Sequence, residues 1–151
     1  MITTIFETFK DNEKFRELLG KLRVGLEQVP SEIALSAFSK REQLAYWLNL
    51  YNITILDELV KIYPQKSLKQ FIEYDAELLE RKLLNVAGVP LSLNDIQFNI
   101  LLEKYQDPLV LYGLYQGYIG SPGIRKHAYT GKNVYRTLNN NAYEFINSNR
   151  G

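Results

Sequence analysis

The chain has 151 residues, 46% of them hydrophobic, which predicts a single globular domain with a real core and excludes a disordered chain. Its net charge of +1, from 18 basic and 17 acidic side chains, argues against nucleic acid or an anionic membrane as partner. It has no cysteine and one histidine, His127, which excludes disulfides, thiolate nucleophiles and any metal site needing two imidazoles from one chain. We therefore expect no metal and no cofactor.

The first forty residues predict two helices. Residues 11–12 can cap the first helix, Pro30 is expected to end it, and Ser31 is expected to cap a short second one. Apolar residues recur at helical spacing in both segments: Phe15, Leu18, Leu19, Leu22 and Leu26 in the first, and Ile33, Leu35 and Phe38 in the second.

A longer helix is expected from about residue 40 to Tyr63. Ser39 and Glu42 match a capping box at its start, and Pro64 supplies the stop. Apolar residues surround nearly the whole circumference of this segment, which is typical of a buried central helix. Its main apolar stripe consists of Leu44, Trp47, Leu48, Tyr51, Ile55, Leu59 and Ile62.

A small β-hairpin interrupts the helical pattern. Ser67 can still cap a short helix, but residues 82–93 change to a strand-like period on either side of Ala87 and Gly88. The hairpin and the helices together predict a mainly α (α+β) fold, a compact helical domain around one buried central helix. We expect residues 1–151 to form a single domain.

Two helices and one further segment are expected to begin after the hairpin. Ser92 and Asp95 have capping-box spacing, and an Asp-Pro pair at 107–108 opens a segment that reaches Tyr118. The last helix is expected to begin at Thr130. Its inward residues are expected to be Val134, Leu138, Ala142, Phe145 and Ile146.

Two asparagines lie in the middle of the central helix. Asn49 and Asn52 are three residues apart, and a buried amide costs about 1–3 kcal/mol unless it is hydrogen-bonded. Both side chains therefore need partners. One interpretation is contact with a ligand or substrate; the other, more common in proteins, is a structural bond from the helix to loop backbone.

The glycine-rich segment 113–123 holds four of the nine glycines. Such backbone can approach a ligand closely or form an anion nest, although the ending of a phosphate loop is absent. Ser121 is the only plausible nucleophile here, and His127 is its only possible histidine base. A turn built from glycine and proline explains the same residues, so an enzyme is the less favoured interpretation.

Aromatic and basic residues gather in the same part of the chain. Tyr112, Tyr115 and Tyr118 have spacing three, which on a helix gives a shared face for packing or for binding. The basic residues Arg125, Lys126, His127, Lys132 and Arg136 are interleaved with Tyr129 and Tyr135. A cluster of this kind can meet phosphate, but the neutral overall charge favours a solvated surface. We therefore expect no nucleic-acid partner.

Four segments in order resemble one bacterial family, the domain-of-unknown-function family numbered 547. They are Tyr-Trp-Leu-Asn-Leu-Tyr-Asn at 46–52, Ser-Leu-Asn-Asp-Ile-Gln-Phe at 92–98, the Asp-Pro segment from 107 to 122, and Ala-Tyr-Thr-Gly at 128–131. The resemblance covers roughly residues 40–151. It also implies that the family domain continues beyond this C-terminus, so we expect the chain to be a fragment of a longer protein.

The chain departs from the family pattern at its ionisable positions. The resemblance implies Glu-His where the chain has Gln97 and Phe98, and arginine at Leu102. It also implies a histidine near Leu111, and cysteines at the positions of Gln116 and Ser121. Such changes remove bases and proton carriers while packing and turn residues remain. This favours a scaffold without the chemistry.

The sequence thus favours a non-catalytic domain that binds a protein partner or a small molecule. The expected binding residues are Asn49, Asn52, Tyr115, Gln116, Gly120, Ser121 and Arg125. The alternative is a serine-dependent hydrolase or transferase using Ser121 and His127, and a third possibility is a purely structural module. The N-terminus lacks a signal-peptide pattern and no stretch is long enough to span a bilayer, so the cytoplasm is the default expectation.

Overall fold

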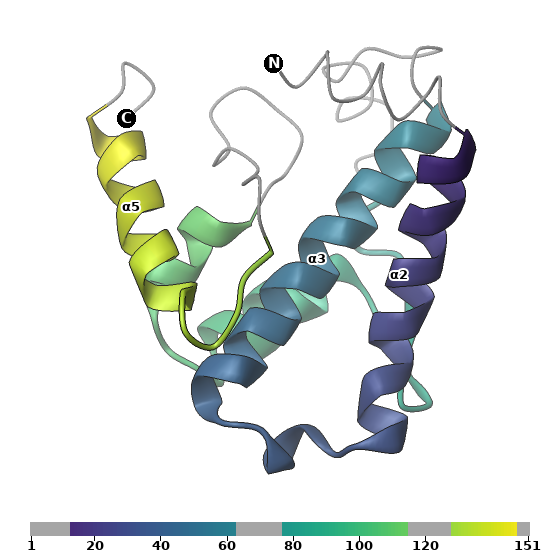
Figure 1. The fold of residues 1–151 in the computed structure, drawn as a ribbon, viewed down its shortest axis with the longest axis horizontal. Coiled ribbons are helices and arrows are strands. Elements are labelled where there is room, and N and C mark those ends of the chain that lie inside the picture. The colour runs from purple at the N-terminus through teal and green to yellow at the C-terminus, as the bar shows by residue number, and fades with distance from the viewer. Residues whose placement is uncertain (1–12, 63–76, 115–127, 148–151) are drawn as a thin grey trace.

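The computed structural model describes residues 13–62, 77–114 and 128–147 (Figure 1). Within them the chain is mainly helical with one two-stranded antiparallel sheet, as the sequence predicts. The elements in chain order are α2 (Glu13–Glu32), η1 (Leu35–Ala37), α3 (Lys40–Ile62), β1 (Leu84–Val86), β2 (Val89–Leu91), η2 (Asp95–Leu102), η3 (Pro108–Gly113) and α5 (Val134–Ile146). The expected caps at residues 11–12 and Ser67, and the expected stop at Pro64, lie outside the described residues.

Helix α3 is the centre of the core. Figure 1 shows it between α2 and α5, and it also contacts η2. The predicted capping box is present at its start, since Ser39 N donates to Glu42 Oε1 (3.2 Å) and Glu42 N donates to Ser39 Oγ (3.1 Å). The predicted apolar stripe is confirmed as buried at Leu44, Trp47, Leu48, Tyr51, Ile55 and Leu59. The side chain of Ile62 lies outside the description.

Helix α2 continues through Pro30 to Glu32, so the prediction that Pro30 ends it and that Ser31 caps a new helix is wrong. Proline has no N–H, and the carbonyl of Leu26 therefore lacks its usual helical donor. The hydroxyl of Tyr46, on α3, donates to that carbonyl instead. A side chain from the neighbouring helix thus satisfies the group that proline would leave unpaired.

The apolar stripe predicted for α2 is only partly buried. Leu19 is in the core and Leu26 packs against it, but Leu18 and Leu22 are 48% and 49% exposed. The contact face of α2 includes Arg23, whose side chain is only 11% exposed and is paired with acidic residues of α3. The charged Arg23 therefore lies in the contact between α2 and α3, where the hydrophobic periodicity predicted Leu18 and Leu22.

The predicted hairpin is confirmed. Leu84 pairs with Leu91 in the antiparallel register, and Leu84 and Val86 bury the same face. Ala87 and Gly88 both have positive φ, 51° and 82°, the combination that a type I′ turn requires.

The Ser92–Asp95 capping box is also present, but the helix that follows is unusual. Ser92 N donates to Asp95 Oδ2 (2.8 Å) and Asp95 N donates to Ser92 Oγ (3.0 Å). Helix η2 then has π-helical hydrogen bonding, in which each N–H reaches the fifth residue back; Glu103 N, for example, donates to Phe98 O (3.1 Å). Ile96 and Leu101 of this helix are buried, and Ile100 is partly buried.

The last helix follows its predicted start, with one correction. Thr130 and Asn133 exchange capping hydrogen bonds, and α5 runs from Val134. Val134, Leu138 and Ala142 are buried, whereas Ile146 is 64% exposed and does not face inward as expected. Ile146 is the last residue of α5, whereas its neighbour Phe145 packs against Tyr112 of η3. Within the described ranges, no helix is long and apolar enough to cross a membrane.

Candidate functional site

The two asparagines of α3 bind loop backbone. Asn49 accepts a hydrogen bond from Tyr129 N through Oδ1 (2.9 Å) and donates one to Tyr129 O through Nδ2 (2.8 Å). Asn52 donates through Nδ2 to Gly113 O (2.7 Å). The prediction that both amides have partners is therefore confirmed, and these partners are backbone groups of chain segments far away in the sequence.

A third asparagine joins this arrangement from α5. Asn141 is buried, and its Nδ2 donates to Tyr112 O (2.8 Å) and to the Tyr129 hydroxyl (3.1 Å). Asn141 was not among the residues predicted for the site. Its place beside Leu138 and Ala142, on the inward stripe of the last helix, is the sequence signal that could have found it. Asn49, Asn52 and Asn141 are called the asparagine cluster below.

The backbone at Gly113 lies very close to both helices. A Cβ at this position would be 2.7 Å from Leu138 Cδ2, 2.9 Å from Leu48 Cδ2 and 3.1 Å from the Tyr129 hydroxyl. Only a residue without a side chain fits there. Gly113 and Tyr129, which flank residues 114–128 in the chain, thus meet between α3 and α5.

A pocket of about 300 Å³ lies next to this junction. It is formed where the C-terminal end of α2, η1, the first turns of α3 and residues 129–131 come together. Its wall is mostly apolar, and its polar side chains include Glu42, Asn49 and Thr130. The residues that line it are Val29, Leu35, Phe38, Glu42, Ala45, Tyr46, Asn49, Tyr129, Thr130 and Gly131. We call it the Tyr129 pocket.

The edge of the Tyr129 pocket is held by close contacts. A Cβ on Gly131 would be 2.7 Å from Glu42 Cγ, so the backbone at 131 presses against the first turn of α3. Thr130 and Asn133 hold the same loop by their reciprocal capping bonds. Burial raises the pKa of the Tyr46 hydroxyl, and the nearby charge of Glu27 raises it further, so this group stays a neutral donor to Leu26 O.

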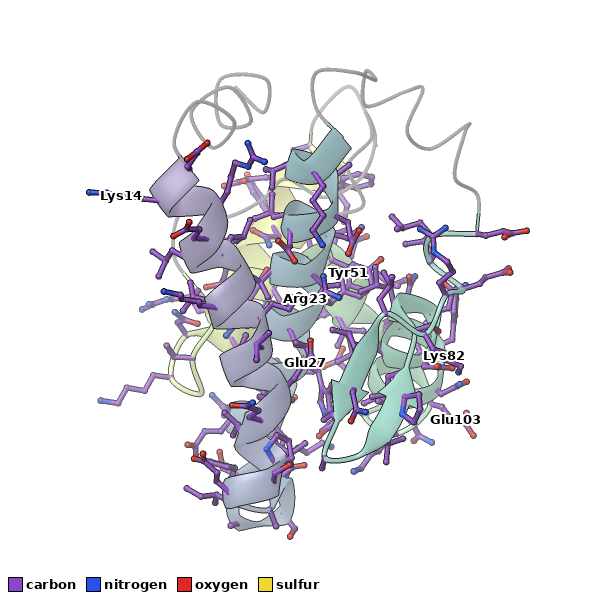
Figure 2. All side chains as sticks on the ribbon, turned by 90° about the vertical axis from the view of Figure 1, so that its right-hand side faces the viewer. Lys14, Arg23, Glu27, Tyr51, Lys82 and Glu103 are labelled. Carbon is purple, nitrogen blue, oxygen red and sulfur yellow. The ribbon has the colours of Figure 1, made fainter. Side chains whose placement is uncertain are left out.

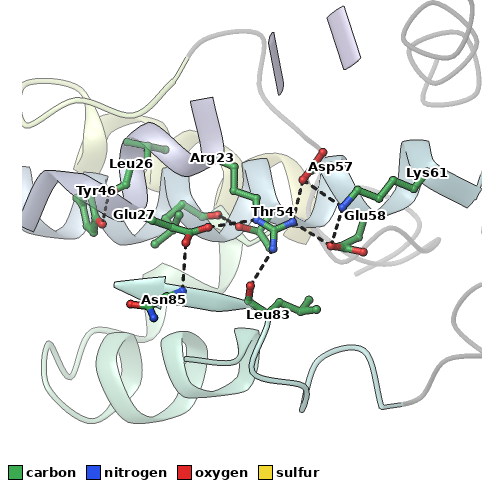
Figure 3. A network of polar contacts seen from close by, with 11 residues as sticks. Arg23, Leu26, Glu27, Tyr46, Thr54, Asp57, Glu58, Lys61, Leu83 and Asn85 are labelled. Atoms are coloured by element: carbon green, nitrogen blue, oxygen red, sulfur yellow. Dashed lines mark hydrogen bonds and ion pairs between the residues drawn. The ribbon is translucent and has the colours of Figure 1, made fainter. Parts of the chain in front are cut away.

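A second, wider hollow of about 760 Å³ lies between α2 and α3, beside a network of charged side chains (Figure 3). Arg23 Nη1 is 2.8 Å from Asp57 Oδ2 and 2.9 Å from Glu58 Oε1, and Nη2 donates to Leu83 O (3.0 Å). Figure 2 shows Arg23 and Glu27 between α2 and the hairpin, where Glu27 also accepts from Asn85 N.

The network of Arg23 is structural in character. Burial lowers the pKa of this guanidinium, but its hydrogen bonds and charge interactions with Glu58 and Asp57 outweigh burial, and the pKa is raised. The charged groups satisfy one another and tie α2 to α3 and to the strand region. No described group of three or more carboxylate or imidazole side chains is arranged to hold a metal ion.

Most of the other predicted site residues lie outside the described ranges. These are Tyr115, Gln116, Gly120, Ser121 and Arg125, together with His127. Of the three evenly spaced tyrosines only Tyr112 is described, and its ring packs edge-on against Phe145 with centroids 5.6 Å apart. Tyr129 is a buried core residue, whereas Arg41 lies over the ring of Tyr135 at 5.0 Å.

Comparison with known proteins gives a family. The model of the family described as "Protein of unknown function, DUF547" matches residues 35–146, from η1 to the end of α5. Comparisons with curated proteins and with solved structures found no match. The matched residues include the asparagine cluster and most of the Tyr129 pocket, and they make up most of the chain. The chain therefore belongs to the DUF547 family, whose function is unknown.

Proposed function

We propose that this domain is a non-catalytic binding module whose ligand occupies the Tyr129 pocket. One observation carries the proposal: segments distant in the chain come together around an open pocket of about 300 Å³ with a mainly apolar wall and a few polar groups. This combination of concavity, apolar lining and sparse polar groups is typical of small-molecule sites.

The rigidity of the pocket's edge supports binding. Tyr129 is held at both backbone groups by Asn49, and Gly131 packs tightly against Glu42. A site whose backbone is already fixed loses little conformational freedom when a ligand enters. The ligand's interactions then contribute more fully to affinity.

The bonding of the lining polar side chains supports a role without catalysis. Glu42 accepts from Ser39 N, Thr130 accepts from Asn133 N, and Asn49 binds Tyr129. Each of these groups holds backbone in place. A catalytic pair would instead need a nucleophile and a base within hydrogen-bond reach of one another.

The glycine-rich segment remains part of the proposal because the asparagine cluster binds the backbone on both sides of it. The asparagine cluster binds backbone at Tyr112 and Gly113 on one side of it and at Tyr129 on the other. The described backbone on both sides of residues 115–127 is therefore bound by the asparagine cluster, and one member of that cluster, Asn49, lines the Tyr129 pocket. We extend the proposal to the contacts predicted there, namely Tyr115, Gln116, Gly120, Ser121 and Arg125.

Thermal unfolding against a panel of metabolites, nucleotides, amines and short peptides tests the proposal. A compound at 100 times its dissociation constant should stabilise the domain by about 2.7 kcal/mol. Leu35→Trp fills the pocket and should abolish that stabilisation. Ser36→Trp is the matched control, because Ser36 is the next residue of η1, is exposed and does not line the pocket.

Two outcomes would contradict the proposal. One is a panel in which no compound stabilises the domain; the other is a stabilising compound that acts equally on the wild type and on Leu35→Trp. Unfolding of each variant without ligand shows whether it folds. Tyr115→Ala and Gln116→Ala then test the glycine-rich segment, and each should weaken binding while the unliganded domain stays folded.

A further inference from the structure

The described lining of the Tyr129 pocket carries negative charge and no positive charge. Among the described residues that line it, Glu42 is the only charged side chain. Two described basic side chains of the adjoining helices have other partners: Arg41 lies over the ring of Tyr135, and Arg23 is paired with acidic residues of α3. The described lining thus offers a ligand a carboxylate and no cationic partner.

Part of the Glu42 carboxylate is available. Its Oε1 accepts from Ser39 N at 3.2 Å, as a capping box requires, and within the described ranges Oε2 has no hydrogen-bond partner. The contact with Gly131 limits the movement of Glu42 Cγ. One oxygen of this exposed carboxylate is therefore left at the edge of the pocket to accept a hydrogen bond from a ligand.

The apolar part of the described lining favours an apolar group. It consists of Val29, Leu35, Phe38 and Ala45, in a pocket of about 300 Å³. A bare metal ion does not match this lining, because such an ion needs several oxygen ligands. An anionic ligand would face Glu42 without a compensating charge.

We infer that the Tyr129 pocket binds a small molecule with an apolar body and a single protonated amine, the amine donating to Glu42 and the body lying against Leu35 and Phe38. This inference rests on the proposed binding function and adds the chemical class of the ligand. An ammonium group has three donors and no acceptor, which suits a carboxylate oxygen.

A substitution can separate the role of Glu42 in capping α3 from its proposed role as the negative charge that binds an amine. A capping box accepts glutamine as well as glutamate at this position, so Glu42→Gln should keep the start of α3 and remove the charge. Glu32→Gln is the matched control, because Glu32 is an exposed acidic residue at the end of α2 that does not line the pocket. Both variants change the net charge equally.

The experiment compares three probes with one aromatic body, phenethylamine, 2-phenylethanol and 3-phenylpropionate, by NMR titration at pH 7 and low salt. We expect the amine to bind about tenfold more tightly than the alcohol, and the carboxylate most weakly, as one charge-assisted hydrogen bond would give. Glu42→Gln should remove the preference for the amine, and Glu32→Gln should keep it.

Equal or tighter binding of the alcohol or the carboxylate would overturn the inference, and so would an amine preference that survives in Glu42→Gln. Failure of the amine to bind at tens of millimolar would overturn it as well. In these cases a different compound that stabilises the wild type but not Leu35→Trp would still support the proposed binding function. If no compound shows this difference between the wild type and Leu35→Trp, both the proposed function and the inference of an amine ligand are contradicted.

Discussion

At the scale of single residues, two glycines give opposite predictions. Gly113→Ala places a Cβ within 3 Å of two buried leucine side chains, Leu138 and Leu48, and should lower the free energy of unfolding by about 1–3 kcal/mol. Gly25 lies inside α2 with no atom within 4 Å of a Cβ built there. Gly25→Ala should raise the free energy of unfolding by about 0.5–1 kcal/mol.

Urea unfolding of the two variants and the wild type checks this pair. Both substitutions add the same methyl group, so the comparison isolates the surroundings of each position. A Gly113→Ala variant as stable as the wild type would show that the backbone does not approach α3 and α5 as closely as described.

The residue scale also marks a limit of prediction from sequence. The place of Asn49 and Asn52 in the middle of an apolar helix was enough to predict that both amides are bonded. Their partners were not predictable, because Tyr129 is 80 residues from Asn49 and Gly113 is 61 residues from Asn52. Such pairings depend on how the helices pack, and a single sequence shows no local trace of them.

At the scale of elements, the Tyr46 hydroxyl and Pro30 should be energetically coupled. Tyr46→Phe leaves the Leu26 carbonyl without its donor and should cost about 1–2 kcal/mol. In a Pro30→Ala background the new N–H of residue 30 can donate to the same carbonyl, so Tyr46→Phe should cost less there.

A double-mutant cycle by urea unfolding measures this coupling, with Pro30→Ala, Tyr46→Phe and the double variant. We expect a coupling free energy of about 1 kcal/mol. An equal cost of Tyr46→Phe in both backgrounds would mean that the hydroxyl does not replace the missing backbone donor.

The start of η2 predicts a pH dependence. Hydrogen bonds from the Lys82 side chain and the Ser92 backbone lower the pKa of Asp95 below its ordinary value. A carboxyl whose pKa is lower in the folded state stabilises the fold above its unfolded pKa, about 3.9 for aspartate. That contribution is lost as the pH falls through the lowered folded pKa.

Urea unfolding of the wild type and Asp95→Asn at several pH values checks this direction. The wild type should be more stable at pH 6, and the difference should shrink as the pH falls below about 4. Glu103→Gln is a control at an exposed carboxyl. A difference between the wild type and Asp95→Asn that is constant from pH 6 to pH 3 would contradict the lowered pKa.

Elements whose signals are local were predicted well. The capping boxes at Ser39 and Ser92 and the hairpin turn each need residues only a few positions apart, and all three are present. The end of α2 was predicted wrongly because the hydrogen bond that compensates for Pro30 is not local. The Tyr46 hydroxyl, 20 residues after Leu26, donates to the Leu26 carbonyl. The π-helical widening of η2 has no sequence rule that we could apply.

At the scale of the whole molecule, α2 precedes the residues that the family model matches, yet it is tied to them. Arg23 joins α2 to α3 through Asp57 and Glu58 and to the strand region through Leu83 O. Arg23→Met should lower the free energy of unfolding by about 2–4 kcal/mol, because it leaves acidic groups partly buried without their main partner.

Arg16→Met is the matched control for Arg23→Met. Arg16 is exposed on the same helix, and its loss should change the free energy of unfolding by no more than about 0.5 kcal/mol. Equal effects of the two substitutions would indicate that α2 is held by its apolar contacts alone, and that the ion pairs of Arg23 contribute little.

The fold class could be predicted because one long segment is apolar nearly all round, which is typical of a buried central helix. The family could be predicted because four of its segments occur in the expected order along the chain. The Tyr129 pocket could not be predicted, because its lining comes from α2, η1, α3 and residues 129–131, which only folding brings together. Of the two predicted site residues that the structure describes, Asn49 lines it and Asn52 does not.

The most direct test of the binding account is NMR mapping with the compound that stabilises the domain most in the panel. The account predicts the largest shift changes at the Asn49 side-chain amide and at the backbone N–H groups of Tyr129, Thr130 and Gly131. Changes confined to the hollow between α2 and α3, around Arg16 and Lys21, would place the ligand elsewhere and contradict the assignment of the Tyr129 pocket as the binding site.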